Sequence, residues 1–201
     1  MAGVRHLLRV IVRPPLVLAS ASPRRRWLLA NAGVVFEVLP VDIDERPRDG
    51  ETPEPYARRM ADRKAAAASA ARGGTWVLAA DTVVALDDAP LGKPADAAEA
   101  ASMLGRLAGR EHVVYTAVAV LAPDASRAAG GVVATRVRFR PLAAADVRRY
   151  IDTGEPFDRA GSYAIQGEGA HLVDRVEGSY TNVIGLPVPE VLAWLGSCGA
   201  L

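Results

Sequence analysis

The sequence predicts an α/β protein built on a mixed β-sheet. In the first half of the chain, strand-like apolar runs alternate with helical patterns, which is typical of parallel strands joined by helices. In the middle, the runs 113–121 and 132–139 follow each other across a loop rich in Ala, Asp, Ser and Gly, which is typical of an antiparallel pair. A sheet with both kinds of pairing is mixed.

The strands are predicted from short apolar runs bounded by polar, glycine or proline residues. These runs are Leu16–Ala19, Val34–Leu39, Trp76–Ala80, Val113–Leu121, Val132–Phe139 and Leu172–Val176. We expect Trp76–Ala80 to end at Asp81-Thr82, and Asp87-Asp88 to form a turn after Val83–Leu86.

The helices are predicted from apolar residues at helical spacing and from residues that begin or end helices. They run from about Trp27 to Gly33, from Thr52-Pro53 to about Arg72, from Asp96 onward, over Ala144–Thr153 and over Glu190–Leu195. Asp96 with Glu99 resembles a capping box, and Gly33 is typical of the residue after a helix end. The spacing i, i+3, i+4, i+7 in the third helix predicts one buried face, made of Ala100, Met103, Leu104 and Leu107.

The composition excludes several classes of protein. The 24 basic and 23 acidic residues nearly cancel, which argues against strong electrostatic binding of nucleic acid or anionic membranes. No uncharged apolar run approaches the roughly 18 residues that would cross a bilayer. The single cysteine, Cys198, excludes a disulfide framework or a cysteine-ligated zinc site, and the three histidines lack metal-ligand spacing.

The N-terminal residues resemble a signal peptide only superficially. Arg9, Arg13 and Pro14-Pro15 interrupt any continuous apolar segment. We therefore expect a cytoplasmic protein with a lead-in over residues 1–15 and one domain of two lobes over residues 16–201. That length is ample for burying a hydrophobic core.

A cluster of cations follows the first predicted strand. Ser20-Ala21-Ser22-Pro23 leads into Arg24, Arg25 and Arg26 at the start of a helix, where positive charge opposes the helix dipole. A bound anion would resolve this conflict, because free backbone N–H groups, two hydroxyls and guanidinium groups would converge on a phosphate-sized space. A solvated arginine cluster is an equally weighted alternative.

Carboxylates follow two other predicted strands. Asp81 ends the run Trp76–Ala80, at the edge where α/β sheets place ligands, and Asp42, Asp44 and Glu45 follow the second strand. Such carboxylates beside arginines suit a magnesium–polyphosphate site better than a zinc site. Taken alone, the position of Asp81 favours a turn or capping role. Asp44 or Glu45 could equally be paired on the surface with Arg46 and Arg48.

Lys64 and Lys93 are the only lysines among the 24 basic residues. Lysine contacts a phosphate oxygen as a compact charge, and the planar guanidinium of arginine cannot take its place without moving. The two lysines are therefore candidate phosphate contacts, with chance as the alternative. Gln166, the only glutamine, lies between Ile165 and Gly167, where an amide could contact a nucleobase or merely complete a turn.

Taken in order, these segments resemble the Maf (septum formation inhibitor) family of nucleoside triphosphate pyrophosphatases. The resemblance runs from Leu16 to about Leu195; the residues before Leu16 depart from the family pattern. Each motif is weak alone, and their order and spacing are specific. The motifs are Leu18-Ala19-Ser20-Ala21-Ser22-Pro23-Arg24-Arg25, Asp44-Glu45, Arg63-Lys64-Ala65, Ala80-Asp81-Thr82, Leu91-Gly92-Lys93-Pro94, Gly154-Glu155-Pro156, Ala160-Gly161, Ile165-Gln166-Gly167 and Val183-Ile184-Gly185-Leu186-Pro187.

The resemblance implies a twisted mixed sheet with a central cleft, similar to the folds of inosine triphosphate pyrophosphatases. It also implies hydrolysis of a nucleoside triphosphate to the monophosphate and pyrophosphate with the help of Mg²⁺ or Mn²⁺. By position, Asp81 matches the proton acceptor of the family. The phosphate- and metal-site positions are matched by Ser22, Arg25, Glu45, Lys64 and Lys93, with Glu45 and Asp81 as metal ligands and Ser20 as a further phosphate contact.

Three further positions distinguish branches of the family. Arg24, Thr82 and Gln166 resemble the branch that acts on dTTP and UTP, and the 7-methyl-GTP branch differs there. We expect a nucleoside triphosphate as the substrate, a homodimer as one candidate assembly, and no nucleic-acid or membrane partner. Two other functions stay open: a housecleaning pyrophosphatase for modified nucleotides, and a non-catalytic nucleotide-binding regulator of septum formation.

Overall fold

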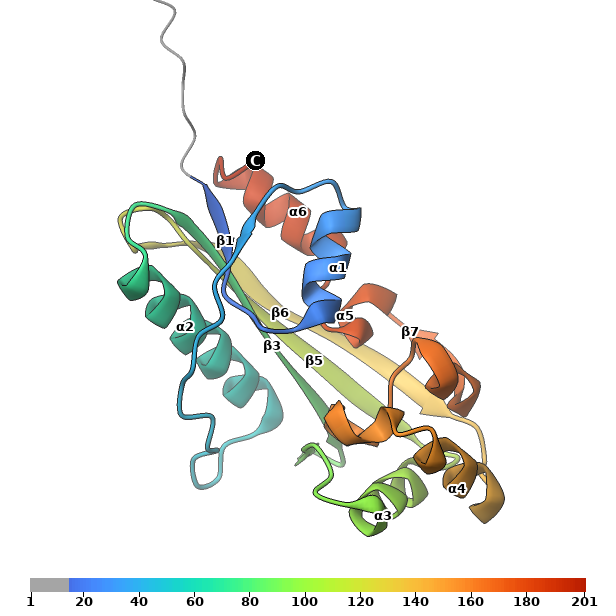
Figure 1. The fold of residues 1–201 in the computed structure, drawn as a ribbon. Coiled ribbons are helices and arrows are strands. Elements are labelled where there is room, and N and C mark those ends of the chain that lie inside the picture. Colours follow the sequence, from blue (N-terminus) through green and yellow to red (C-terminus); the bar gives the residue numbers. More distant parts are fainter. Residues whose placement is uncertain (1–14) are drawn as a thin grey trace, which may run out of the picture.

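A seven-stranded mixed sheet forms the centre of the protein in a computed structural model that describes residues 15–201 (Figure 1). The strand order is β2-β1-β3-β5-β6-β7, with β4 paired to β3. Their bounds are β1 Leu16–Leu18, β2 Glu37–Val38, β3 Trp76–Leu86, β4 Ala89–Leu91, β5 Glu111–Leu121, β6 Arg127–Phe139 and β7 Val173–Glu177. Strand β1 is parallel to β2 and β3, and the other pairs are antiparallel. The predicted mixed sheet and the predicted antiparallel pair are therefore confirmed.

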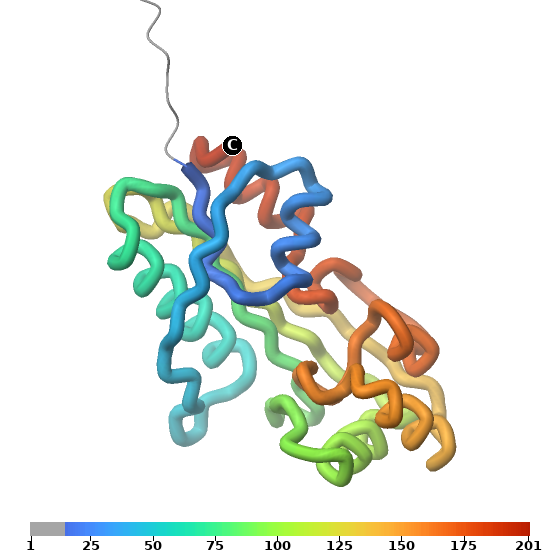
Figure 2. The backbone as a smooth tube through the Cα atoms, viewed as in Figure 1, coloured from blue at the N-terminus to red at the C-terminus, as the bar shows by residue number. Residues whose placement is uncertain are grey.

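Helices cover both faces of this sheet. Helix α2 lies along one face, whereas α1, α5 and α6 lie on the other, and α3 and α4 lie toward the far end of the long strands (Figures 1 and 2). Their bounds are α1 Pro23–Asn31, α2 Pro53–Ala71, α3 Ala97–Leu107, α4 Ala144–Asp152, α5 Tyr180–Ile184 and α6 Val188–Ser197, with 3₁₀ turns η1 Glu155–Asp158, η2 Ala160–Ser162 and η3 Gly167–Leu172. The lead-in predicted over residues 1–15 lies, except for Pro15, outside the described residues.

The alanine-rich stretch of α2 is a packing surface. One small-residue cluster joins α2 to β3 and β5, and its members are Ala57, Ala61, Ala65 and Ala68 with Ala19, Val77, Ala79, Val83, Ala117 and Ala119. Because alanine extends little beyond the backbone, α2 can approach the sheet closely. This close approach brings Lys64, the residue directly before Ala65, within reach of β3.

Three local helix features predicted from the sequence are confirmed. The Asp96 side chain accepts a hydrogen bond from the Glu99 backbone N–H at 2.8 Å, so it caps α3 as predicted. The predicted apolar face of α3 is buried. Gly33 has a φ of +77°, a left-handed conformation that glycine adopts at low cost after a helix.

Several predicted boundaries are wrong. Strand β2 spans only Glu37–Val38 of the predicted run 34–39, and Val35 is 90% exposed. Strand β6 begins at Arg127 rather than Val132, because Gly130 and Gly131 belong to the strand and not to the loop. A Cβ atom at Gly131 would come within 2.9 Å of the Trp194 ring, so this strand glycine makes room for α6. Helix α1 begins at Pro23, which places all three arginines inside its first turns.

The largest correction concerns Asp81. The sequence predicted that a strand ends there, but β3 runs without interruption from Trp76 to Leu86. On one side of β3, β1 pairs with Trp76–Leu78 and β4 pairs with Val84–Leu86. Within residues 15–201, the part of β3 that contains Asp81 and Thr82 has no strand partner on that side, and this gap is where a ligand can approach the sheet.

No helix within residues 15–201 is both long enough and apolar enough to cross a membrane.

Candidate active site

A cleft of about 1080 Å³ opens at the unpaired part of β3. Its volume is slightly above the range of about 300–1,000 Å³ that is common for small-molecule sites in proteins. All ten site residues predicted from the sequence line this one cleft: Ser20, Ser22, Arg24, Arg25, Glu45, Lys64, Asp81, Thr82, Lys93 and Gln166. The fold therefore brings together residues that are spread over most of the chain.

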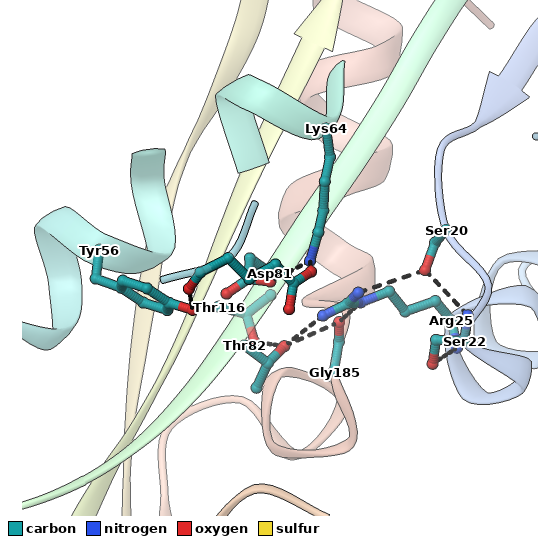
Figure 3. A network of polar contacts seen from close by, with 10 residues as sticks. Ser20, Ser22, Arg25, Tyr56, Lys64, Asp81, Thr82, Thr116 and Gly185 are labelled. Atoms are coloured by element: carbon teal, nitrogen blue, oxygen red, sulfur yellow. Dashed lines mark hydrogen bonds and ion pairs between the residues drawn. The ribbon is translucent and has the colours of Figure 1, made fainter. Parts of the chain in front are cut away.

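Asp81 lies at the centre of a compact group of charges (Figure 3). Its side chain is 12% exposed, and Oδ1 accepts a hydrogen bond from the Lys64 ammonium at 2.6 Å. The same ammonium lies 2.7 Å from Oε1 of Glu45. Lys64 thus bridges the two carboxylates that the sequence analysis selected as metal ligands.

Helix α2 also holds the loop that carries Glu45. The Tyr56 hydroxyl donates to the Glu45 carbonyl at 2.7 Å, and Arg63 Nη1 donates to the Asp44 carbonyl at 2.8 Å. The Asp44 carboxylate pairs instead with Arg46, at 2.7 Å, on the surface. The surface alternative considered for these acidic residues therefore holds for Asp44, and Glu45 faces the cleft.

The surroundings of Asp81 favour a carboxyl group that can accept a proton. Burial raises the pKa of Asp81 above its ordinary value of 3.8, and the positive charges of Lys64 and Arg25 partly oppose this rise. A carboxylate with a raised pKa is a stronger base than an ordinary one. Asp81 therefore has the burial and the charged neighbours expected of a general base.

The second cationic group comes from the start of α1. The Ser22 hydroxyl accepts from the Arg25 backbone N–H at 3.4 Å and so caps the helix, as serine commonly does. The Arg25 guanidinium turns back across the cleft and donates to Ser20 Oγ at 3.4 Å and to Thr82 Oγ1 at 3.0 Å. Burial lowers the pKa of Arg25 from its ordinary value, with the charge of Asp81 opposing that shift.

Gly185 completes the contacts of Arg25. Its carbonyl oxygen accepts from Arg25 Nε at 2.8 Å. Its φ of +130° lies in the region that strains other residues, so a glycine is needed to present this carbonyl directly after α5. Neighbouring residues of a strand point to opposite faces, so Asp81 reaches α2 while Thr82 reaches Arg25 and Gly185 on the other side (Figure 3).

The remaining predicted residues line the cleft without contacting Asp81. Lys93 is 64% exposed and pairs with Asp158 of η1, with 2.6 Å between Nζ and Oδ1. Arg24 and Gln166 are partly exposed at the cleft wall. The structure therefore assembles one group around Asp81 and leaves Lys93 and Gln166 in a second, more open part of the cleft.

The donor set fits a divalent cation that is shared with a substrate. No group of three or more His, Cys, Asp or Glu side chains that could enclose a metal occurs within residues 15–201. Glu45 and Asp81 are nevertheless close enough to contact one ammonium, and Mg²⁺ is commonly held by one or two carboxylates together with substrate phosphates. The carboxylate pair suits that mode of binding and not an all-protein site.

Two further residues of this site, Tyr56 and Gly185, were not predicted from the sequence. Tyr56 fixes the Glu45 loop, and burial raises its pKa to about 12, so it acts as a neutral donor. Gly185 lies within the motif Val183-Ile184-Gly185-Leu186-Pro187, and its carbonyl orients Arg25. An arginine at the start of one helix gives no sign of which distant carbonyl it contacts.

Known proteins are similar to this chain over most of its length. Residues 15–198 match the family model described as Maf-like protein. A dTTP/UTP pyrophosphatase of Myxococcus xanthus is 52% identical over 184 residues, which cover 92% of this chain and 92% of that protein. A dTTP/UTP pyrophosphatase of Nitratidesulfovibrio vulgaris is 52% identical over 188 residues, which cover 93% of this chain and 89% of that protein.

Solved structures were compared as well. A nucleoside-triphosphatase / dITP/XTP pyrophosphatase from Mycobacterium abscessus aligns with a TM-score of 0.40 and 20% sequence identity, over 62% of this chain and 74% of that chain.

Proposed function

The chain belongs to the Maf family, and we propose on that premise that it hydrolyses nucleoside triphosphates, with dTTP and UTP as substrates, to the monophosphate and pyrophosphate. The observation that supports this reaction most directly is the buried Asp81 carboxylate, which faces the open part of β3 between Lys64 and Arg25. Similarity to two dTTP/UTP pyrophosphatases over more than nine-tenths of this chain supports the choice of substrates.

In the proposed reaction, Asp81 accepts a proton from the attacking water. The oxygen of that water forms a bond to phosphorus as the anhydride bond between the α- and β-phosphates breaks, and the electron pair leaves with the departing phosphate oxygen. Lys64 and Arg25 stabilise the negative charge on the phosphate oxygens, because phosphoryl transfer depends mainly on positioning and electrostatics. Ser20 and Ser22 would offer hydroxyl donors to the same phosphates.

We also propose a divalent cation. Glu45 and Asp81 would hold Mg²⁺ or Mn²⁺ together with the phosphates, and the ion would supply additional positive charge at the phosphate oxygens. Lys64, which contacts both carboxylates, would keep its place beside them and contact a phosphate oxygen. Lys93, Arg24 and Gln166 are proposed to contact the outer phosphates and the base, because they line the cleft without contacting Asp81.

A panel of substrates tests the proposal. The purified protein is incubated with Mg²⁺ or Mn²⁺ and with dTTP, UTP, CTP, ATP, GTP, 7-methyl-GTP or modified pyrimidine triphosphates. Phosphate is measured with and without inorganic pyrophosphatase, and Asp81→Asn serves as the inactive control. We expect phosphate only when the coupling enzyme is present, a requirement for the metal, and the highest kcat/KM for dTTP and UTP.

The other outcomes separate the remaining functions. Much higher kcat/KM for modified pyrimidines would identify a housecleaning enzyme. Binding of triphosphates without any release of pyrophosphate would identify a nucleotide-binding regulator. Phosphate release without the coupling enzyme would show stepwise removal of phosphates and contradict the proposed reaction.

A further inference from the structure

A chain of hydrogen bonds leads from the active-site arginine into the core of the sheet (Figure 3). Arg25 Nη2 donates to Thr82 Oγ1 at 3.0 Å, and Thr82 Oγ1 lies 2.9 Å from Oγ1 of Thr116 on β5. Thr116 Oγ1 then donates to the backbone carbonyl of Asn182 in α5 at 3.0 Å. Thr116 and Asn182 are both 0% exposed.

The direction of every hydrogen bond in this chain is determined by its two ends. A guanidinium can only donate and a carbonyl can only accept. The Thr116 hydroxyl hydrogen is directed at the Asn182 carbonyl, so the hydrogen between the two threonine oxygens must come from Thr82. The Thr82 hydroxyl therefore accepts from Arg25, and its single hydrogen points to Thr116 Oγ1 at 2.9 Å, with the Gly185 carbonyl as a second, longer acceptor at 3.4 Å. It has no hydrogen left to offer a substrate.

The inner end of the chain is held rigidly. The Asn182 amide Nδ2 donates to the Val114 carbonyl and to Thr135 Oγ1, each at 2.9 Å. These contacts attach α5 to β5 and β6, and α5 leads directly into Gly185, whose carbonyl accepts from Arg25 Nε. Two of the Arg25 nitrogens thus donate to groups that are linked to the same buried asparagine, Gly185 through α5 and Thr82 through Thr116.

We propose that Thr116 and Asn182 are positioning residues that hold the Arg25 guanidinium in its orientation toward the triphosphate, with Thr82 acting through Arg25 rather than as a donor to the substrate. This inference rests on the proposed function, because it assumes that Arg25 contacts a triphosphate. It gives the buried polar residues behind the cleft a role in substrate binding. It also explains why a threonine lies in the stretch Val113–Leu121, where the only other residue with a polar group in its side chain is Tyr115.

Thr116→Val tests the inference, because it exchanges the hydroxyl for a methyl group of similar size. We expect kcat/KM for dTTP to fall about tenfold and the Kd for the non-hydrolysable analogue α,β-imido-dTTP to rise by a similar factor. Thr116→Ser, which keeps the hydroxyl, should restore both values to within about twofold of wild type. Thr75→Val is the matched control, because Thr75 is also buried and its hydroxyl donates only to the Arg72 carbonyl, away from the cleft.

A double-mutant cycle separates positioning from a general structural role. In an Arg25→Ala background, Thr116→Val should change analogue binding by less than about twofold, because the group that it positions is gone. An undiminished loss in that background would overturn the inference, as would wild-type binding and kinetics in Thr116→Val. If Thr116→Val does not give a cooperative thermal transition, Thr82→Val interrupts the same chain and takes its place in the cycle.

The proposed function can fail independently of this inference. Absence of pyrophosphate release by the wild-type protein with every triphosphate would reject the proposed function. The analogue-binding cycle would still decide whether Thr116 acts through Arg25.

Discussion

The two lysines of the chain line the same cleft in very different surroundings. The Lys64 side chain is 12% exposed and lies 2.6 Å from Asp81 and 2.7 Å from Glu45. The Lys93 side chain is 64% exposed, and its partner Asp158 is 72% exposed. One lysine is therefore built into a packed polar group, and the other belongs to a surface ion pair.

This difference indicates how the cleft prepares for a substrate. Around Lys64, the cations and the base are held in place by α2 and β3 before any ligand arrives, so little reorganisation is needed. Around Lys93, a phosphate would have to replace Asp158, and an exposed pair of this kind contributes little energy to begin with. We therefore expect substitutions in the packed group to have the larger effects, mainly on turnover, and substitutions around Lys93 to affect mainly KM.

The largest effect is expected for Asp81→Asn. The amide keeps the shape of the side chain but cannot accept a proton from water, so kcat should fall by about 10²- to 10⁴-fold. The folded protein should be as stable as wild type or more stable near neutral pH, because the buried charge is removed while Lys64 keeps Glu45 as a partner. Steady-state kinetics and thermal melting measure the two effects, and full activity in this variant would contradict the assignment of the base.

The pH dependence of the wild-type enzyme should show the same group. Because burial raises the pKa of Asp81, kcat/KM should rise about tenfold per pH unit on the acid side and level off above that raised pKa. The free energy of unfolding should instead fall as the pH rises, because ionisation of the buried carboxyl group destabilises the folded state. The contribution of Asp81 to stability is fully present below its ordinary pKa of 3.8 and is lost as the pH rises through the raised value.

The difference between wild type and Asp81→Asn isolates this ionisation. Melting temperatures of the two proteins, measured over the same pH range, should diverge in favour of the variant as the pH rises. A constant difference would show that the pKa of Asp81 is not raised by folding.

Lys64→Arg is expected to have the next largest effect. The planar guanidinium is larger than the ammonium that lies between Glu45 and Asp81, so it cannot take that position unless the loop or the strand moves. We expect kcat/KM to fall about 10²-fold, as for the loss of a group that stabilises transition-state charge. Arg58→Lys on the same helix makes the reverse exchange at an exposed position and should leave the kinetics unchanged. Wild-type kinetics in Lys64→Arg would show that positive charge alone is sufficient there.

Much of the fold could be predicted from local patterns, because these patterns report local physics. The capping contact of Asp96, the buried face of α3 and the turn at Asp87-Asp88, where both residues have positive φ, were all visible in a few neighbouring residues. The course of β3 was not. Asp81 interrupts an apolar stretch and therefore resembled a strand end, whereas its charge is accommodated in mid-strand by Lys64, a residue 17 positions earlier on a different element.

In the candidate site, too, the residues with local signals were predicted and their distant partners were not. Ser22, Arg25 and Asp81 were found because they break local rules or match motifs, and all three line the cleft. Their partners were not found, because the contact of Arg25 with Gly185 spans 160 positions and that of Thr116 with Asn182 spans 66. A polar residue in a buried strand signals that it has a partner, and only the three-dimensional structure shows which one.

Lys93→Arg is expected to have the smallest effect and tests the comparison of the two lysines directly. The exposed side chain has room for a guanidinium, which can keep the pair with Asp158, so we expect kcat/KM to fall by about fivefold or less, close to 1 kcal/mol. Most of the change should appear in KM. Asp158→Asn is the matched variant: it frees Lys93 for the substrate and should lower KM slightly, by a factor that shrinks at high salt. Lys93→Arg could instead lower kcat as much as Lys64→Arg does. In that case, Lys93 must be held in the complex with the triphosphate as closely as Lys64 is held in the free enzyme. The open part of the cleft would then have to close on the triphosphate, and the contrast between the two lysines would describe only the free enzyme.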